Sequence, residues 1–130
     1  MKVSARRRKG YAHTVTFEDH TLIVDEPVES GGADTGPRPT ALLAMSLASC
    51  VAVTIEMYAD RKQWVVGNLE VEVEYVLDPR AGRARYDVTL KLPAELSDEQ
   101  VERILVIAGR CPVHRTLAGE IEIDDSAERV

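Results

Sequence analysis

The stretch "PTALLAMSLASCVAVTIEMYADRKQ", residues 39–63, decides the fold of this chain. Pro39 suits the first position of a helix, where its missing N–H costs nothing, and neither glycine nor proline follows it in the stretch. The pattern predicts one helix over Thr40–Gln63, about 36 Å long at about 1.5 Å per residue. The first two-thirds of the stretch are apolar on every side, which is typical of a helix that is buried all round.

A chain of 130 residues can hardly surround such a helix by itself. A sheet on one side and a second subunit on the other would cover it, so we expect a homodimer. The uncharged stretch Ala41–Ile55 is shorter than the roughly 20 residues that a membrane span needs, and it contains Ser46, Ser49, Cys50 and Thr54. We therefore expect no membrane association.

The length and composition are those of one soluble globular domain, which we expect to span residues 1–130. A net charge of −6 argues against general affinity for nucleic acid or for anionic membranes. The basic opening "MKVSARRRKGYAH" is not followed by the apolar run of a secretory signal, so we expect a cytoplasmic location. In a reducing cytoplasm, the two cysteines are expected to be free or catalytic rather than a structural disulfide.

Short alternating segments precede the helix. They predict three strands, at residues 2–8, 12–17 and 21–25, with "EDH" as a tight turn between the second and the third. The segment "EPVESGGADTGPRP", residues 26–39, gathers glycines and prolines without an apolar period. It predicts a single loop of a length at which loops are often functional.

Two strictly alternating segments follow the helix. "NLEVEVEYVL" (residues 68–77) and "RARYDVTLKL" (residues 83–92) are joined by the turn residues "DPRAG", so they predict a β-hairpin. One face of this hairpin is apolar and the other carries glutamates opposite arginines and a lysine, which is typical of a solvated outer face.

The last third of the chain predicts two helices and a strand. Ser97 and Gln100 form a capping box before a helix that Gly109 ends. Pro112 begins the short helix "PVHRTLA", and "EIEID", residues 120–124, is interpreted as a final strand. The fold class is therefore α+β, with antiparallel sheets around a long buried central helix.

The two cysteines lie in different surroundings. Cys50 lies in the middle of the long helix. Its neighbours on the same face are all uncharged: Ser46, Leu47, Val53, Thr54 and Met57. These surroundings predict an inert core thiol. Cys111 precedes Pro112 and so falls at a helix N-cap, where unpaired N–H groups and the helix dipole favour a thiolate. Taken singly, Cys111 is the better candidate for a reactive thiol.

Two segments together carry a family resemblance. "VDEPVESGGADTGPRPTALLAMSLASC" (residues 24–50), followed after a gap by "CPVHRTL" (residues 111–117), resembles the OsmC/Ohr family of small thiol peroxidases. The spacing of the cysteines, 111 − 50 = 61 residues, fits that family as well. The resemblance implies an intertwined α+β homodimer with two central helices and active sites at the dimer interface.

The resemblance also implies a reaction cycle without a metal or a cofactor. Cys50 would be the peroxidatic thiolate, which attacks the O–O bond of an organic hydroperoxide and releases an alcohol. The resulting sulfenic acid would condense with Cys111, the resolving thiol, to a disulfide. An external dithiol would then reduce that disulfide by exchange.

An arginine holds the thiolate in this family, and it comes from an early strand. Arg6, Arg7 and Arg8 stand together at that place, and the period-2 alternation of a strand favours Arg7 as the catalytic arginine. Arg38, in the loop before the helix, is a second candidate. We assign Arg38, Thr40, Leu47 and Met57 to the binding of the substrate beside Cys50.

One position departs from the family pattern. The family usually has a glutamate nine or ten residues before the first cysteine, where it orients the arginine. Those positions are Ala41 and Thr40 here, so no carboxylate is present, although Thr40 can accept one hydrogen bond. The departure indicates an arginine held in another way, or a member with weak or altered peroxidase activity.

Two other readings remain open. Cys50, Cys111 and His114 include a C-x-x-H spacing, but zinc would need a fourth ligand, so we expect no metal. The second reading is a non-catalytic or weakly active protein that binds a small hydrophobic ligand at the dimer interface. Such a protein would keep its ligand affinity when both cysteines are changed to serine, whereas a peroxidase would lose turnover.

Overall fold

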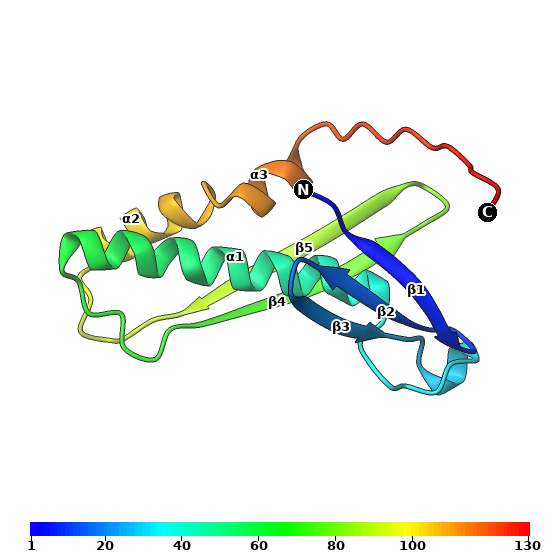
Figure 1. Cartoon of the computed structure of the whole chain (residues 1–130). Helices are drawn as coiled ribbons and strands as arrows, with labels where there is room; N and C mark the ends of the chain where they lie inside the picture. Colours follow the sequence, from blue (N-terminus) through cyan, green and yellow to red (C-terminus); the bar gives the residue numbers. More distant parts are fainter. The chain divides into compact units, whose positions relative to one another are not determined.

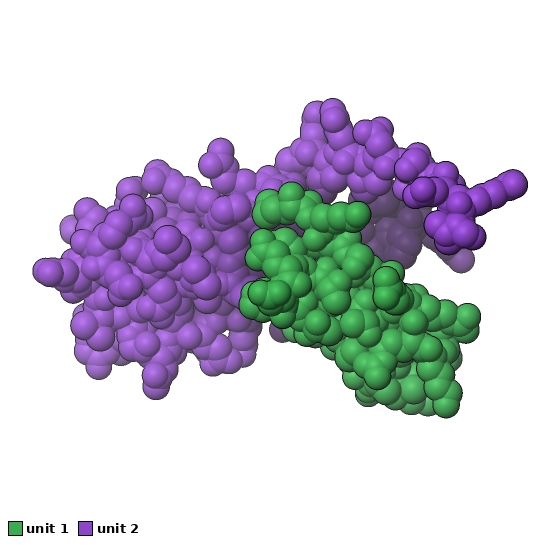
Figure 2. Space-filling view, viewed as in Figure 1, with its two compact units in different colours: residues 1–45 green, residues 46–130 purple.

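The computed structural model describes residues 1–130 and has an α+β fold with antiparallel sheets and one long helix (Figure 1). The fold class predicted from the sequence is confirmed. The chain divides into two compact units, Met1–Met45 and Ser46–Val130, which Figure 2 shows in separate colours. The single domain expected over residues 1–130 stays a prediction.

The first unit contains a three-stranded antiparallel sheet in the order β1-β2-β3. Its strands are β1 (Ser4–Lys9), β2 (Ala12–Phe17) and β3 (His20–Val24), within two residues of the predicted bounds. Phe17 pairs with His20, so the predicted tight turn between β2 and β3 is a two-residue loop. Glu18, in that loop, has a left-handed backbone with φ 50°.

A buried carboxylate organises the loop that follows β3. Asp25 is only 2% exposed and accepts four hydrogen bonds from three residues of the loop. The donors are the N–H groups of Glu26 (2.8 Å), Ala33 (3.2 Å) and Thr35 (3.2 Å), together with the Thr35 hydroxyl (2.7 Å). The Thr35 hydroxyl, with the three N–H groups, holds the pKa of Asp25 below its ordinary value.

Two glycines of this loop lie where the main chain approaches itself closely. A Cβ at Gly32 would lie 1.9 Å from the carbonyl oxygen of Glu26, and a Cβ at Gly36 would lie 2.1 Å from that of Ile23. Neither approach leaves room for a side chain. The loop also contains a short 3-10 helix, η1 (Val28–Ser30), which the sequence pattern did not predict.

The long helix α1 runs from Pro39 to Lys62, so the predicted helix is confirmed within one residue at each end. In the second unit its inner stripe is Leu47, Val51, Ile55 and Ala59, all buried. A fully buried aliphatic side chain contributes about 1.5–3 kcal/mol, so this stripe is a main source of the unit's stability. Residues of α2 (Asp98–Ala108) and of a β-hairpin complete the same core.

The hairpin consists of β4 (Glu70–Asp78) and β5 (Arg83–Lys91), and its alternation agrees with the prediction. Apolar partners face each other across the strands, for example Val73 with Val88 and Tyr75 with Tyr86. On the outer face, Lys91 forms ion pairs with Glu70 and Glu72. Arg85 instead pairs with Asp87 on its own strand, so only part of the expected cross-strand charge pairing is present.

The C-terminal helices begin and end where the sequence predicts. Ser97 and Gln100 form the capping box of α2, and α3 runs from Pro112 to Ala118 with Cys111 as its N-cap. The predicted final strand at residues 120–124 is wrong, because this segment pairs with no other strand. Ile121 and Ile123 are consequently exposed.

The outer face of α1 is apolar and uncovered. Only 22% of its most apolar 18-residue window is buried, and Val53 and Met57 are 56% and 64% exposed. By length and composition alone, α1 is long and apolar enough to cross a membrane. The core helix of a soluble protein meets the same criterion, and the inner stripe of α1 packs in a protein core.

The hydrogen bonds of Asp25 give a test of the loop. We expect Asp25→Asn to lower the melting temperature, because the buried amide NH₂ cannot accept a hydrogen bond and the charge is lost. Asp34→Asn is the matched control: it makes the same change at an exposed position nine residues further along the loop. Equal melting temperatures for the two variants would contradict the role assigned to Asp25.

The same carboxylate predicts a dependence of stability on pH. The pKa of Asp25 is lowered in the folded chain from its ordinary value of 3.8, so ionised Asp25 stabilises the fold. This contribution is fully present above pH 3.8 and is lost as the pH falls through the lower folded pKa. In thermal melts between pH 6 and pH 2.5, the difference between the wild type and Asp25→Asn should therefore shrink at the acid end.

Candidate active site

Both cysteines are free thiols, and the second unit brings them together. Cys50, on α1, is half-buried and packs against the core cluster that contains Cys111. Cys111, the N-cap of α3, is completely buried. The Cys50 thiol lies close enough to be one of the causes that raise the pKa of Cys111.

The environment of Cys111 differs from the one predicted for a reactive thiol. Its N-cap position is confirmed, since the N–H of His114 donates a hydrogen bond to Cys111 Sγ at 3.2 Å. Burial nevertheless raises the pKa of Cys111, and the Cys50 thiol raises it further, against the lowering effect of that N–H. Desolvation of the buried sulfur outweighs the helix end, so the pKa of Cys111 is raised where the helix position alone favoured a thiolate.

Cys50 opens onto a shallow cavity of about 430 Å³. The wall is formed by one face of α1 and the first residues of α3: Ser46, Ser49, Val53, Thr54, Met57, Pro112 and Val113. The wall therefore combines three hydroxyl groups with apolar side chains. Met57 lies beside Cys50 as predicted, and the thiol is accessible rather than enclosed in the core.

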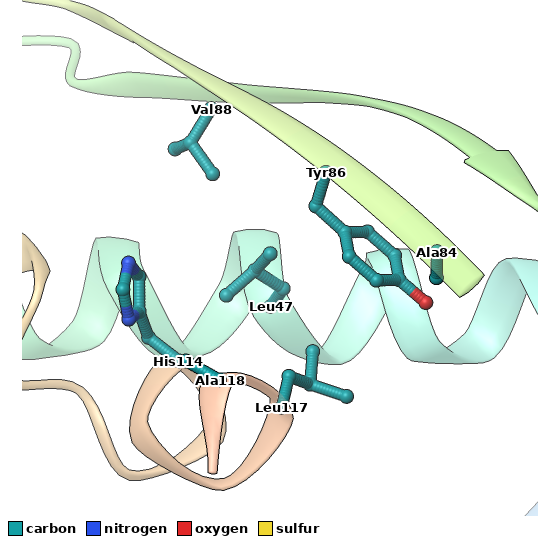
Figure 3. A pocket seen from close by; sticks show the side chains of 7 residues that line it. All are labelled: Leu47, Ala84, Tyr86, Val88, His114, Leu117 and Ala118. Atoms are coloured by element: carbon teal, nitrogen blue, oxygen red, sulfur yellow. The ribbon is translucent and has the colours of Figure 1, made fainter. Parts of the chain in front are cut away.

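Leu47 does not line the cavity at Cys50. It is buried and borders a separate cavity of about 220 Å³ between α1, β5 and α3, which Figure 3 shows from close by. The remaining lining residues are Ala84, Tyr86, Val88, His114, Leu117 and Ala118. Two side chains assigned together to binding, Leu47 and Met57, thus lie in two different cavities.

The other predicted site residues lie in the first unit. Arg7, on β1, is exposed, and its Nε donates a hydrogen bond to the carbonyl oxygen of Gly10 at 3.3 Å. Arg38 Nη2 lies 3.9 Å from a carboxylate oxygen of Glu29. Thr40 is exposed in the first turn of α1. The predicted roles of these three residues beside the thiols stay predictions.

Glu29 is the residue that the sequence reasoning missed. The family pattern places a carboxylate at position 40 or 41, whereas the structure has one on η1, paired with Arg38. The pair joins residues nine positions apart in a loop, a contact that no helical or strand periodicity predicts. The side chain of His114 lines the cavity beside Leu47, a position that the C-x-x-H spacing did not predict.

No group of three or more histidine, cysteine, aspartate or glutamate side chains lies where it could hold a metal ion. Cys50, Cys111 and His114 therefore do not form a metal centre in this structure. His114 takes part in the site through its main-chain N–H, which donates to Cys111, and its imidazole lines the cavity beside Leu47.

The α+β fold thus places an accessible free thiol, Cys50, against the core cluster that contains the buried free thiol Cys111. The family model described as OsmC-like protein matches residues 31–125, so the chain belongs to the OsmC-like protein family. The resemblance found in residues 24–50 and 111–117 is thereby confirmed at the level of the family.

Solved structures and a curated protein are similar to this chain. A Psychrobacter arcticus protein attributed to the osmotic stress and detoxification response superposes with a TM-score of 0.79 at 24% identity, covering 89% of this chain and 87% of that one. The organic hydroperoxide resistance protein OhrB of Bacillus subtilis has a TM-score of 0.61 at 26% identity, covering 91% and 90%. An uncharacterised Haloferax volcanii protein is 25% identical over 126 residues, covering 95% and 92%.

The environments of the two thiols predict an order of reaction. With iodoacetamide at pH 8, Cys50 should be alkylated well before Cys111, because Cys50 is accessible whereas Cys111 is buried and its pKa is raised. Peptide mass spectrometry at successive times measures both rates, and in 6 M guanidinium the two rates should become similar. Faster alkylation of Cys111 in the folded protein would contradict the placement of the two sulfurs.

Proposed function

We propose that this protein is a thiol peroxidase that reduces organic hydroperoxides, with Cys50 as the peroxidatic and Cys111 as the resolving cysteine. The observation that carries the proposal is the packing of an accessible thiol, Cys50, against the core cluster that contains the buried Cys111, in a member of the OsmC-like family. OhrB of Bacillus subtilis, an organic hydroperoxide resistance protein, matches this chain over nearly its whole length and supports the same activity.

The cycle balances in three steps. The Cys50 thiolate attacks the distal oxygen of the hydroperoxide, the O–O bond breaks, and protonation of the leaving oxygen gives an alcohol and a Cys50 sulfenic acid. The Cys111 sulfur then displaces the hydroxyl group, which leaves as water, and the S–S bond forms. An external dithiol reduces this disulfide by exchange, becomes oxidised itself and returns both thiols.

The walls around Cys50 support an organic substrate over hydrogen peroxide. Val53, Met57 and Val113 present apolar surface to the cavity, and burying an alkyl or aryl group there is favourable by about 25 cal/mol per Å². The hydroxyls of Ser46 and Thr54 lie in the same wall and can donate to the peroxide oxygens. A reducing cytoplasm, which we propose as the location, keeps the resting enzyme in the dithiol state.

We also propose that an arginine of the first unit holds the Cys50 thiolate. Arg7 and Arg38 are the candidates, and their surroundings differ. Arg38 is paired with Glu29, which provides the carboxylate that positions 40 and 41 lack. Both side chains of this pair are largely exposed and their charged atoms lie 3.9 Å apart, so the pair contributes little to stability.

The uncovered face of α1 supports a homodimer as the active form. Val53 and Met57 border the cavity at Cys50 and are more than half exposed, so a second copy packed on α1 would bury them and enclose the substrate. Light scattering should give twice the mass of the chain, and Met57→Glu should shift the equilibrium to monomer whereas the neighbouring Glu56→Gln should not. A wild-type monomer at every concentration would contradict the dimer.

The peroxidase activity is tested by following both thiols. One equivalent of cumene hydroperoxide should convert the wild type to an intramolecular Cys50–Cys111 disulfide, with loss of two hydrogens in the intact mass. Cys111→Ser should stop at a Cys50 sulfenic acid that dimedone traps, and Cys50→Ser should consume no peroxide. A stable sulfinic acid at Cys50 with Cys111 still free would contradict the resolving role.

The same assay identifies the arginine and the type of peroxide. Arg7→Met and Arg38→Met each remove one candidate cation, and Arg6→Met, on the neighbouring residue of β1, is the matched control. The variant that loses the thiolate's partner should slow Cys50 oxidation at least tenfold, which corresponds to about 1.4 kcal/mol of barrier. Oxidation by hydrogen peroxide should be slower than by cumene hydroperoxide, and the reverse order would contradict the apolar substrate site.

A further inference from the structure

The cavity beside Leu47 lies on the opposite side of α3 from the cavity at Cys50. Pro112 and Val113 border the Cys50 cavity, whereas His114, Leu117 and Ala118 border the other one. The second cavity is formed within one chain, by α1, β5 and α3, and it contains neither cysteine (Figure 3). It is therefore a separate feature from the proposed peroxide site.

The lining of this cavity combines apolar walls with two unused polar groups. Leu47, Val88 and Leu117 supply aliphatic surface. The imidazole of His114 and the hydroxyl of Tyr86 make no hydrogen bond within the chain, and Figure 3 shows them at the two ends of the cavity with Leu47 between them. An apolar cavity with a few convergent polar groups is the usual form of a small-molecule site.

We infer that this cavity binds a small, mostly apolar molecule with one hydrogen-bonding oxygen, and that occupancy restrains α3 and with it Cys111. The volume of about 220 Å³ exceeds the roughly 150 Å³ of an apolar cavity known to hold benzene, so it suits an aromatic ring with a short substituent. The ring would lie against Leu47 and Val88, and its oxygen would accept a hydrogen bond from His114.

The link to Cys111 follows from the position of α3. This helix has only seven residues, its first turn begins at Cys111, and its inner side forms one wall of the cavity. Reagents reach the buried Cys111 thiol only when the helix opens locally, and that opening also dismantles the cavity. A ligand that binds only the closed form lowers the population of the open form by the factor 1 + [L]/Kd.

Binding is tested on the full chain with benzyl alcohol and toluene as probes. In ¹³C-methyl NMR spectra, both probes should give saturable shifts at Leu47, Val88 and Leu117, while the methyls of Val53 at the Cys50 cavity stay unchanged. Benzyl alcohol should bind roughly threefold to tenfold more tightly than toluene, the range expected for one hydrogen bond. Shifts confined to Val53, or no saturable shift at all, would overturn the inference.

Variants separate this cavity from other sites. Ala84→Phe fills it from β5 and should abolish binding, whereas Thr89→Phe, on the outer face of the same strand, should not. Ala118→Phe fills the cavity from α3 and replaces the first variant if that one fails to fold. His114→Leu should keep toluene binding and remove the preference for benzyl alcohol; a preference that survives would overturn the role of His114.

Restraint of α3 is measured in a Cys50→Ser variant, where Cys111 is the only thiol. The rate of its reaction with Ellman's reagent should fall about tenfold when benzyl alcohol is at about nine times its Kd. The same concentration of benzyl alcohol should leave the rate unchanged in Ala84→Phe. An unchanged rate in the Cys50→Ser protein at saturated binding would overturn the link between the cavity and Cys111.

Discussion

The burial of one helical stripe holds the second unit together. Leu47, Val51, Ile55 and Ala59 recur every four residues on α1, so they form a single line against which α2 and the β4–β5 hairpin pack. Cys111 is part of this core, and Cys50 lies at its edge. The proximity of the two cysteines thus follows from the same packing that stabilises the unit.

Local patterns were sufficient to predict most of the secondary structure. Pro39 and the glycine-free run after it defined α1, and the capping box at Ser97 and Gln100 defined the start of α2. The prediction of a final strand at residues 120–124 was wrong. The alternating pattern shows only that a segment is able to pair, whereas a strand also needs a neighbouring strand, and this chain alone provides none. An isolated segment cannot show whether a partner for its backbone exists.

The site was less predictable, because burial depends on residues far apart in the sequence. The position of Cys111 at a helix N-cap could be predicted from Pro112 beside it. The direction of its pKa shift could not be predicted, because the apolar residues that enclose its sulfur come from α1 and α2. The pairing of Cys50 with Cys111 came only from the family resemblance. The pairing of Glu29 with Arg38 could not be predicted for a similar reason, because a loop has no regular period from which neighbouring side chains can be inferred.

The conformation of the Asp25 loop depends on the spacing of the hydrogen-bond donors along the chain more than on side-chain packing. Donors at positions 26, 33 and 35 reach one carboxylate, so an inserted residue between them would displace some donors although much of the segment is exposed. The exposed turn between β4 and β5 has one side-chain hydrogen bond, from the Ala81 N–H to Asp78. An epitope or fluorescent tag therefore belongs in that hairpin tip, where added length leaves the strands paired.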